Sequence, residues 1–207
     1  MSQFAFYFDS SRCTGCRTCE IACRDYKNLS EDIVYRRVYD YEGGSWTTNE
    51  DGTVSSDAFV YHLSLACNHC DAPACAHVCP TGAMHKDPNT GIVSVDEHKC
   101  IGCGYCHMAC PYNAPTVDRS LGYSVKCNAC AERLEENKNP ICVDACPLRA
   151  LAFGTPEEME KLADSRGDVA PLPSPSLTYP NLYIKNNKDS RPAESYEGKV
   201  ANILEVL

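Results

Sequence analysis

Sixteen cysteines in four groups of four are the residues of this 207-residue chain whose type and spacing could do chemistry. Group one is Cys13, Cys16, Cys19 and Cys23; group two is Cys67, Cys70, Cys75 and Cys79; group three is Cys100, Cys103, Cys106 and Cys110; group four is Cys127, Cys130, Cys142 and Cys146. Thiolates bind zinc and iron–sulfur clusters, and oxidised thiols pair as disulfides. The spacing within the groups must decide among these three kinds of site.

Group three has the spacing of a bacterial ferredoxin. The stretch "CIGCGYCHMACP", from Cys100 to Pro111, matches C-x2-C-x2-C-x3-C-P, in which the fourth cysteine ligates the other cluster of a pair. Group one has the same spacing with Arg24 in place of the proline, group two is C-x2-C-x4-C-x3-C-P, and group four has a longer loop before C-x3-C-P. Together the groups predict four [4Fe–4S] clusters.

The distance between groups along the chain predicts which of them share clusters. Groups two and three are separated by only residues 80–99, a compact ferredoxin spacing, so groups one and four are left to each other. The expected ligand sets are Cys13, Cys16, Cys19 and Cys146; Cys23, Cys127, Cys130 and Cys142; Cys67, Cys70, Cys75 and Cys110; and Cys79, Cys100, Cys103 and Cys106. Sequential pairing, group one with two and group three with four, remains the alternative.

Disulfides and zinc fit the spacing less well. A bridge between neighbours such as Cys13 and Cys16 would close a loop too small to gain much entropy. Structural zinc typically uses two well-separated CxxC pairs, whereas groups one and three each place three cysteines within seven residues. A zinc-binding interaction module therefore stays as the alternative of a different class.

Composition and charge exclude some functions. Hydrophobic residues are 43% of the chain including cysteine, and roughly 35% without it, which is low for a globular protein, so bound metal should supply folding energy. The net charge of −9 argues against a nucleic-acid partner. No apolar run is long enough to span a membrane, and no signal peptide precedes "FAFYF". We expect the chain to stay in the cytoplasm or to cross a membrane attached to another protein.

Each cysteine group follows a short apolar or alternating run, which predicts strands at 4–8, 59–66, 91–95 and 123–126. A cysteine loop and a helical turn should follow each strand, and proline ends most of these turns. Residues 24–66 contain an insertion, and "VYRRVYDYEGGSW" predicts a β-hairpin within about 30–60 that turns at the Gly-Gly pair. The predicted fold is α+β, with two interlocked bacterial-ferredoxin-like 2[4Fe–4S] modules in residues 1–154.

Residues 155–207 differ in character from the cysteine-rich part. Thr155, Pro156 and Glu158 predict a capped helix start, and Gly167 fits the helix end. The prolines of 171–180 predict an extended C-terminal arm that packs along the domain or a partner.

No Gly-rich phosphate loop and no nucleophile with its base is apparent, so the chain is not expected to be an enzyme by itself. The histidines are expected to form loop hydrogen bonds, since each cluster already has four thiolates; they are His62, His69, His77, His85, His98 and His107. Four cations border the cysteine groups and either raise reduction potentials or are solvated; they are Arg17, Arg24, Lys99 and Lys126.

Four stretches carry a family resemblance: "SRCTGCRTCEIACRDYKNL", "CNHCDAPACAHVCPTGAMHK", "CIGCGYCHMACPY" and "KCNACAERLEENKNPICVDACPLRALAFG". They resemble the iron–sulfur subunits of bacterial dimethyl sulfoxide reductases, in the molybdopterin oxidoreductase superfamily. The resemblance covers nearly the whole chain. Related subunits serve thiosulfate, polysulfide, selenate or formate enzymes, which remain alternatives together with a free polyferredoxin.

The resemblance implies an electron-transfer subunit between two partners. One partner is a catalytic subunit with a molybdopterin cofactor, and the other is an integral membrane anchor that oxidises menaquinol. The cluster on Cys100, Cys103 and Cys106 would lie nearest the quinol, and the cluster on Cys13, Cys16 and Cys19 nearest the catalytic subunit. Nitrate reductase relatives have tryptophan at the position of Cys103 and a three-iron cluster there, so the cysteine here predicts four irons.

The resemblance also bears on location. Catalytic subunits of this family usually carry a twin-arginine signal and are exported together with their folded iron–sulfur partner. The expected location is therefore peripheral on the cytoplasmic membrane, at its outer, periplasmic face. The cytoplasmic face is the alternative.

Overall fold

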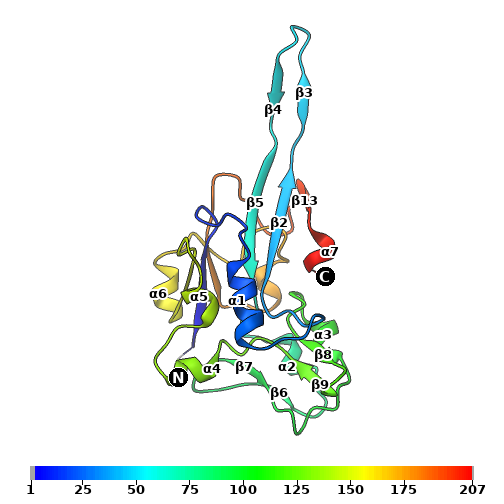
Figure 1. The fold of residues 1–207 in the computed structure, drawn as a ribbon, viewed down its shortest axis with the longest axis vertical. Helices are drawn as coiled ribbons and strands as arrows, with labels where there is room; N and C mark the ends of the chain where they lie inside the picture. The colour runs from blue at the N-terminus through cyan, green and yellow to red at the C-terminus, as the bar shows by residue number, and fades with distance from the viewer. Residues whose placement is uncertain (1–2, 207) are drawn as a thin grey trace.

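Short helices and small sheets form one body, from which a two-stranded ribbon projects (Figure 1). The computed structural model describes residues 3–206. The helices are α1 (Thr18–Tyr26), α2 (Ala74–His77), α3 (Tyr105–Ala109), α4 (Ala131–Glu135), α5 (Ile141–Asp144), α6 (Pro156–Glu160) and α7 (Ile203–Val206), with a 3₁₀ turn at Pro175–Leu177. Helices this short are not stable by themselves, so packing and bound groups must hold them. The architecture agrees with the predicted α+β class.

The central sheet joins the two ends of the chain. Its strands are β10 (Leu151–Gly154), β1 (Ala5–Asp9), β12 (Leu182–Lys185) and β11 (Ser165–Arg166), in that order. The β1 strand pairs antiparallel with β10 and parallel with β12. Because β1 leads into cysteine group one and β10 follows group four, this pairing brings groups one and four together.

The insertion between groups one and two forms a long antiparallel hairpin. Its stem pairs β2 (Arg37–Gly43) with β5 (Phe59–Leu65), and β13 (Gly198–Val200) adds to the outer edge of β2. Beyond the stem, β3 (Trp46–Thr48) pairs with β4 (Val54–Ser56). We call residues 45–57 the β-ribbon. The chain reverses at Asn49–Thr53, so the predicted turn at Gly43–Gly44 is wrong: cross-strand pairing resumes beyond the glycines at β3 and β4.

Two small hairpins accompany groups two, three and four. They are β6 (Met84–Lys86) with β7 (Val93–Val95), and β8 (Thr116–Asp118) with β9 (Tyr123–Val125). The α2 and α3 helices, which carry cysteines of groups two and three, pack against each other. Groups two and three are thus adjacent in space as well as in sequence.

The C-terminal part lies along the body of its own chain. The capping box at Thr155 and Glu158 is formed, but the helix ends at Glu160 and not near Gly167. Asp164 N–H instead donates to Ile184 O, and Gly167 follows a strand that pairs with β12, so strand pairing replaces further helix. The proline-rich stretch then contacts group two, where Thr178 O and Tyr179 O accept hydrogen bonds from Ala72 and Asp71.

The largest buried cluster mixes aromatic residues with cysteines. It contains Phe6, Phe8, Tyr41 and Tyr61 of the two main sheets together with cysteines of several groups. Tyr61 is 2% exposed and donates its hydroxyl to Ala170 O at 2.8 Å. Among the helices of residues 3–206, none combines the length and apolar character needed to cross a bilayer.

Candidate metal centres

Groups one and four contribute cysteines to a first cavity. Cys13, Cys16 and Cys19 line it from the loop after β1 and the start of α1, and Cys146 lines it from the turn after α5. Apolar side chains close the cavity, including Phe8, Val38 and Leu151. We call these four cysteines set A; Cys16 is exposed to solvent and the other three are not.

The remaining cysteines of the same two groups form set B. They are Cys23 on α1, Cys127 and Cys130 before α4, and Cys142 on α5. The α1 helix, which carries Cys23, packs against α5, which carries Cys142. Burial raises the pKa of Cys23, and Cys127, Cys142 and Cys130 raise it further. All four are buried.

Groups two and three supply two more sets in the same crossed manner. Set C lines one cavity and comprises Cys67, Cys70, Cys75 and Cys110. Set D lines another and comprises Cys79, Cys100, Cys103 and Cys106. In set D, Cys103 is exposed, whereas three of the four cysteines of set C are buried. In both pairs of groups, therefore, the last cysteine of one group lies with the first three of the other.

Hydrogen-bond donors surround the sulfurs of the sets. Ser64 Oγ lies 3.2 Å from Cys19 Sγ, and Ser124 Oγ lies 3.3 Å from Cys106 Sγ. Backbone N–H groups point at four further sulfurs, at 3.3–3.4 Å: Met84 at Cys79, Ser124 at Cys100, Ala129 at Cys127 and Ala150 at Cys146. Donors to sulfur stabilise thiolate charge, and in iron–sulfur sites they raise the reduction potential.

The sets follow one another in the order A, B, C, D. Sets A and B meet in the largest buried cluster, which contains Cys19, Cys142 and Cys146, and sets B and C meet in a smaller cluster that contains Cys67 and Cys127. Sets C and D meet in an apolar cluster that contains Cys75 and Cys106. The exposed cysteines, Cys16 and Cys103, belong to the two end sets.

Arg36 is a buried cation at the junction of sets A and B, and no pattern in the sequence indicated it. It is 2% exposed, stacks over the Phe6 ring at 5.1 Å, and donates from Nη1 to Ser64 Oγ at 3.0 Å. Burial opposes its charge, but the thiolates of Cys142 and Cys19 more than compensate and raise its pKa. In sequence it is one of two adjacent arginines at a strand start, and only the fold distinguishes it from Arg37.

His69 and Lys126 occupy the junction of sets B and C. His69 is 2% exposed and accepts the Val93 N–H at 3.0 Å on Nδ1, and Lys126 is 6% exposed and donates to the carbonyls of Val93 and Cys127. Burial opposes ionisation of Cys67, yet the neighbouring His69 and Lys126 lower its pKa to about 5. The buried ammonium of Lys126 therefore offsets thiolate charge at this junction.

The other cations chosen from the sequence pair with oxygen atoms, although Arg17 also lines the cavity of set A. Arg17 pairs with Asp40 at 3.0 Å and with Glu205, while Lys99 is exposed and pairs with Asp96. Arg24 donates to backbone carbonyls of residues 30 and 31. Several histidines form hydrogen bonds as expected: His107 to Pro115 O, His85 to Ala83 O and His62 to Asp40. Only Lys126 of the four predicted cations is buried.

The geometry of the sets fits a multi-atom cluster. Within residues 3–206, no three or more histidine, cysteine, aspartate or glutamate side chains converge closely enough to hold a single metal ion. In sets A, C and D the four cysteines instead line a shared cavity. Four thiolates are the donor set of a [4Fe–4S] cluster, which is larger than one ion.

Comparison with known proteins gives the family. A 4Fe-4S dicluster domain matches residues 58–156, and a 4Fe-4S binding domain matches residues 10–27. The protein is 50% identical over 206 residues to the B subunit of the anaerobic dimethyl sulfoxide reductase of Haemophilus influenzae, a match that covers 100% of each. The chain belongs to this family. The B subunit of the Escherichia coli enzyme is 51% identical over 205 residues, 99% of each protein. The family resemblance predicted from the sequence is thus confirmed.

A more distant relative widens the comparison. The iron–sulfur subunit of the nitrate-inducible formate dehydrogenase of Escherichia coli is 31% identical over 189 residues, which are 88% of this chain and 64% of that one. The protein is therefore an iron–sulfur electron-transfer subunit of the dimethyl sulfoxide reductase type, and it carries several [4Fe–4S] clusters.

Proposed function

We propose that the chain relays electrons through four [4Fe–4S] clusters, one in each of sets A to D, within two interlocked ferredoxin-like modules. The observation that carries the proposal is the crossed arrangement of the sets, in which Cys146 joins Cys13, Cys16 and Cys19 around one cavity. The same crossing joins Cys110 to the first three cysteines of group two. Ferredoxins pair their clusters in this way.

The residues of the chain would hold the four cluster sites in sequence and set the exposure to water and the charge around each site. When bound, [4Fe–4S] clusters accept and release single electrons. Burial of sets B and C would keep water away from the middle of the relay. Arg36 and Lys126 would offset negative charge at two of the junctions. Exposed Cys16 and Cys103 would mark the two ends at which electrons leave or enter.

Each end would serve a different partner. The surface beside Cys103 is apolar, because Ile101, Tyr105 and Met108 are 65%, 52% and 71% exposed. Contiguous exposed apolar side chains mark interaction sites, and this end suits an integral membrane anchor that oxidises menaquinol. The set A end would then face the molybdopterin-containing catalytic subunit. The chain would lie peripherally on the cytoplasmic membrane, on its periplasmic face after export with that subunit.

Metal analysis and copurification test the proposal. About 16 irons and 16 sulfides per chain, with spin-coupled [4Fe–4S] EPR signals after reduction, are expected for four clusters. A molybdenum-containing subunit and a membrane protein should copurify anaerobically. A soluble monomer with the same iron content would favour a free polyferredoxin. About four zincs without sulfide would refute electron transfer altogether.

A further inference from the structure

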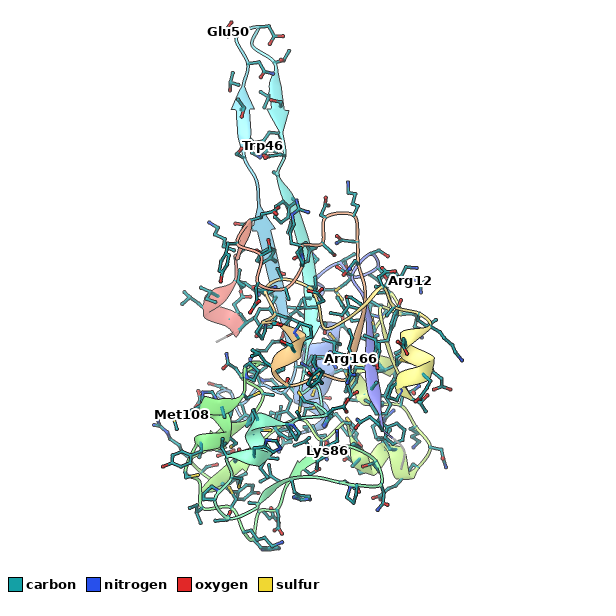
Figure 2. The ribbon with its side chains drawn as sticks, turned by 180° about the vertical axis from the view of Figure 1, so that it is seen from behind. Arg12, Trp46, Glu50, Lys86, Met108 and Arg166 are labelled. Atoms are coloured by element: carbon teal, nitrogen blue, oxygen red, sulfur yellow. The ribbon has the colours of Figure 1, made fainter. Side chains whose placement is uncertain are left out.

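The β-ribbon, residues 45–57, has no packing of its own to hold it. All six residues of β3 and β4 are exposed, including Trp46 at 74% and Val54 at 58%. A two-stranded hairpin without a core beneath it is marginally stable in water. Figure 2 shows the ribbon standing clear of the body, with Glu50 at its tip. A feature of this kind is expected to gain its stability from a partner.

Two glycines, Gly43 and Gly44, lie at the root of the β-ribbon, where it leaves the body of the protein. A side chain on Gly43 would meet Glu197 O at 2.5 Å and the Phe59 ring, and Gly44 has φ +79° with Asp57 O at 2.3 Å from where its Cβ would be. Both glycines are needed for the chain to leave the body at this point. Close backbone contacts therefore fix the position at which the β-ribbon leaves the body.

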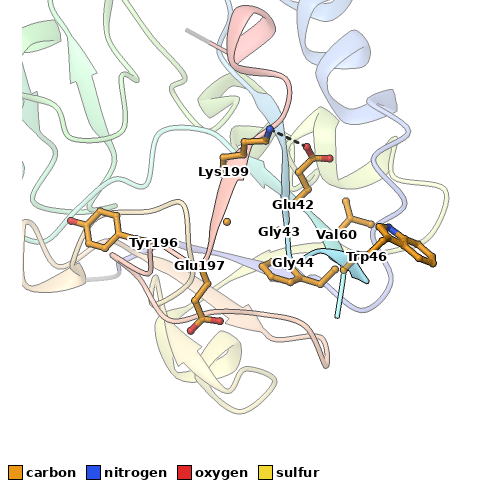
Figure 3. Close-up of a pocket in the computed structure, with 11 residues that line it drawn as sticks. Glu42, Gly43, Gly44, Trp46, Val60, Tyr196, Glu197 and Lys199 are labelled. Atoms are coloured by element: carbon orange, nitrogen blue, oxygen red, sulfur yellow. Dashed lines mark ion pairs between the residues drawn. The ribbon is translucent and has the colours of Figure 1, made fainter. Parts of the chain in front are cut away.

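A groove with two exposed aromatic rings lies at this root (Figure 3). Trp46 and Tyr196 stand on either side of Gly43 and Gly44, and Tyr196 is 95% exposed. Val60, also more than half exposed, lies beside Trp46. Tryptophan and tyrosine are enriched among the residues that dominate binding energy at protein interfaces. The root thus offers apolar anchors for a protein partner.

The β-ribbon is negatively charged. Residues 44–58 include Glu50, Asp51 and Asp57 but no lysine or arginine. Hydrogen bonds from Thr53 lower the pKa of Asp51, and hydrogen bonds from Ser45 lower the pKa of Asp57, so both stay ionised at neutral pH. A complementary partner surface would be basic around the tip and apolar around the root.

The stem of the ribbon packs directly on the loop of set A. Asp40 on β2 accepts from Arg17 at 3.0 Å and lies 2.7 Å from His62 on β5. The His62 ring covers Gly15, where an added Cβ would lie 2.6 Å from Nδ1. Met108, beside set D, lies at the far side of the body from the ribbon (Figure 2). A partner held by the ribbon would consequently sit at the set A end.

We propose that the β-ribbon and its root form the docking element for the catalytic subunit, with Trp46 anchored in an apolar pocket and the acidic tip in a basic cleft of that subunit. The proposal rests on the proposed function, since that function assigns the catalytic subunit to the set A end. Docking there would hold the partner beside Cys16, the exposed cysteine of set A.

Binding of the intact, cluster-loaded chain to the purified catalytic subunit tests the proposal. Trp46→Ala should weaken binding by tenfold or more, as expected for an anchor residue. A double variant, Glu50→Lys with Asp51→Lys, should slow association most at low salt. Glu135→Lys on α4 is the matched control, because it reverses an exposed charge away from the ribbon. Iron content should be unchanged in all of them.

Amide hydrogen exchange provides a second readout. Amides of residues 46–56 should exchange quickly in the free chain and slowly in the complex. Equal affinity of the ribbon variants and the unmodified chain, with no protection of the ribbon, would overturn the docking proposal alone. Loss of binding to the membrane anchor instead would overturn it in favour of that partner. Failure of the unmodified chain to bind the catalytic subunit would overturn the proposed function.

Discussion

Replacing Arg36 with methionine should lower the reduction potentials of the clusters that we propose at sets A and B. Methionine keeps an unbranched apolar side chain against the Phe6 ring but removes a permanent positive charge. That charge is close to both sets, because the thiolates of Cys142 and Cys19 act on the guanidinium. Without it, adding an electron to either site becomes less favourable.

The structure sets the size of the effect. Arg36 Nη1 lies 3.0 Å from Ser64 Oγ, and Ser64 Oγ lies 3.2 Å from Cys19 Sγ. The cation is therefore at most about 6 Å from that sulfur. With an effective dielectric constant of about 20, a unit charge at ~6 Å contributes about 3 kcal/mol. This corresponds to ~120 mV for a one-electron couple. Because the added electron is spread over a cluster that extends beyond the sulfur, we expect a fall of about 50–100 mV.

Redox titration followed by EPR measures the shift for each signal separately. Arg36→Lys keeps the charge and should move the potentials much less. Arg119→Met removes an exposed charge from the turn between β8 and β9 and should leave the potentials of sets A and B unchanged. Iron content must match that of the unmodified protein, so that the signals report potential and not cluster loss. Unchanged potentials for fully loaded Arg36→Met would refute the assignment of Arg36 to this junction.

Three other predictions follow from the described contacts. Cys146→Ser should alter the EPR signal of set A and leave that of set B intact; the reverse result would contradict the crossed pairing. Tyr61→Phe removes a buried hydroxyl that donates to Ala170 O, so the free energy of unfolding should fall by about 1 kcal/mol in denaturant titrations, whereas an unchanged value would mean that the bond contributes nothing. Anaerobic chelation of iron should abolish the cooperative thermal unfolding transition, because cysteines of sets A, B and C lie in the largest buried cluster. Persistence of a sharp transition would contradict metal-dependent folding.

Local patterns predicted the elements next to the cysteines. Each apolar run before a group corresponds to a strand, at β1, β5, β7 and β9. The capping box at Thr155 was also visible, because its hydrogen bonds join residues three apart. Such features depend on neighbours in sequence. The crossed sets could be predicted as well, because ferredoxin spacing already contains the rule that the fourth cysteine leaves its group.

Features decided by distant contacts were not predictable. A Gly-Gly pair is typical of a turn. Gly43 and Gly44 instead lie at the root of the β-ribbon, where the carbonyl groups of Glu197 and Asp57 approach them closely. Glycine is typical of a helix end, which is why Gly167 was predicted to end the helix. The α6 helix instead ends at Glu160, and the chain pairs β11 with β12 before Gly167. Arg36 carries no local sign of burial. Its position depends on a serine on the opposite strand and on cysteines of two different groups.

The parallel pairing of β1 with β12 has a consequence for the order in which the protein can be made. Sets C and D need only residues up to Cys110, so a nascent polypeptide that has just emerged through β9 already contains both of them. Sets A and B are incomplete until Cys142 and Cys146 have been synthesised. The central sheet beside them also needs β12, which comes later still. Polypeptides stalled after β9 should therefore acquire iron at the set D end first, which iron analysis of stalled complexes can check. The set A end, which we propose faces the catalytic subunit, is completed last, so docking there would require β12 to have been made.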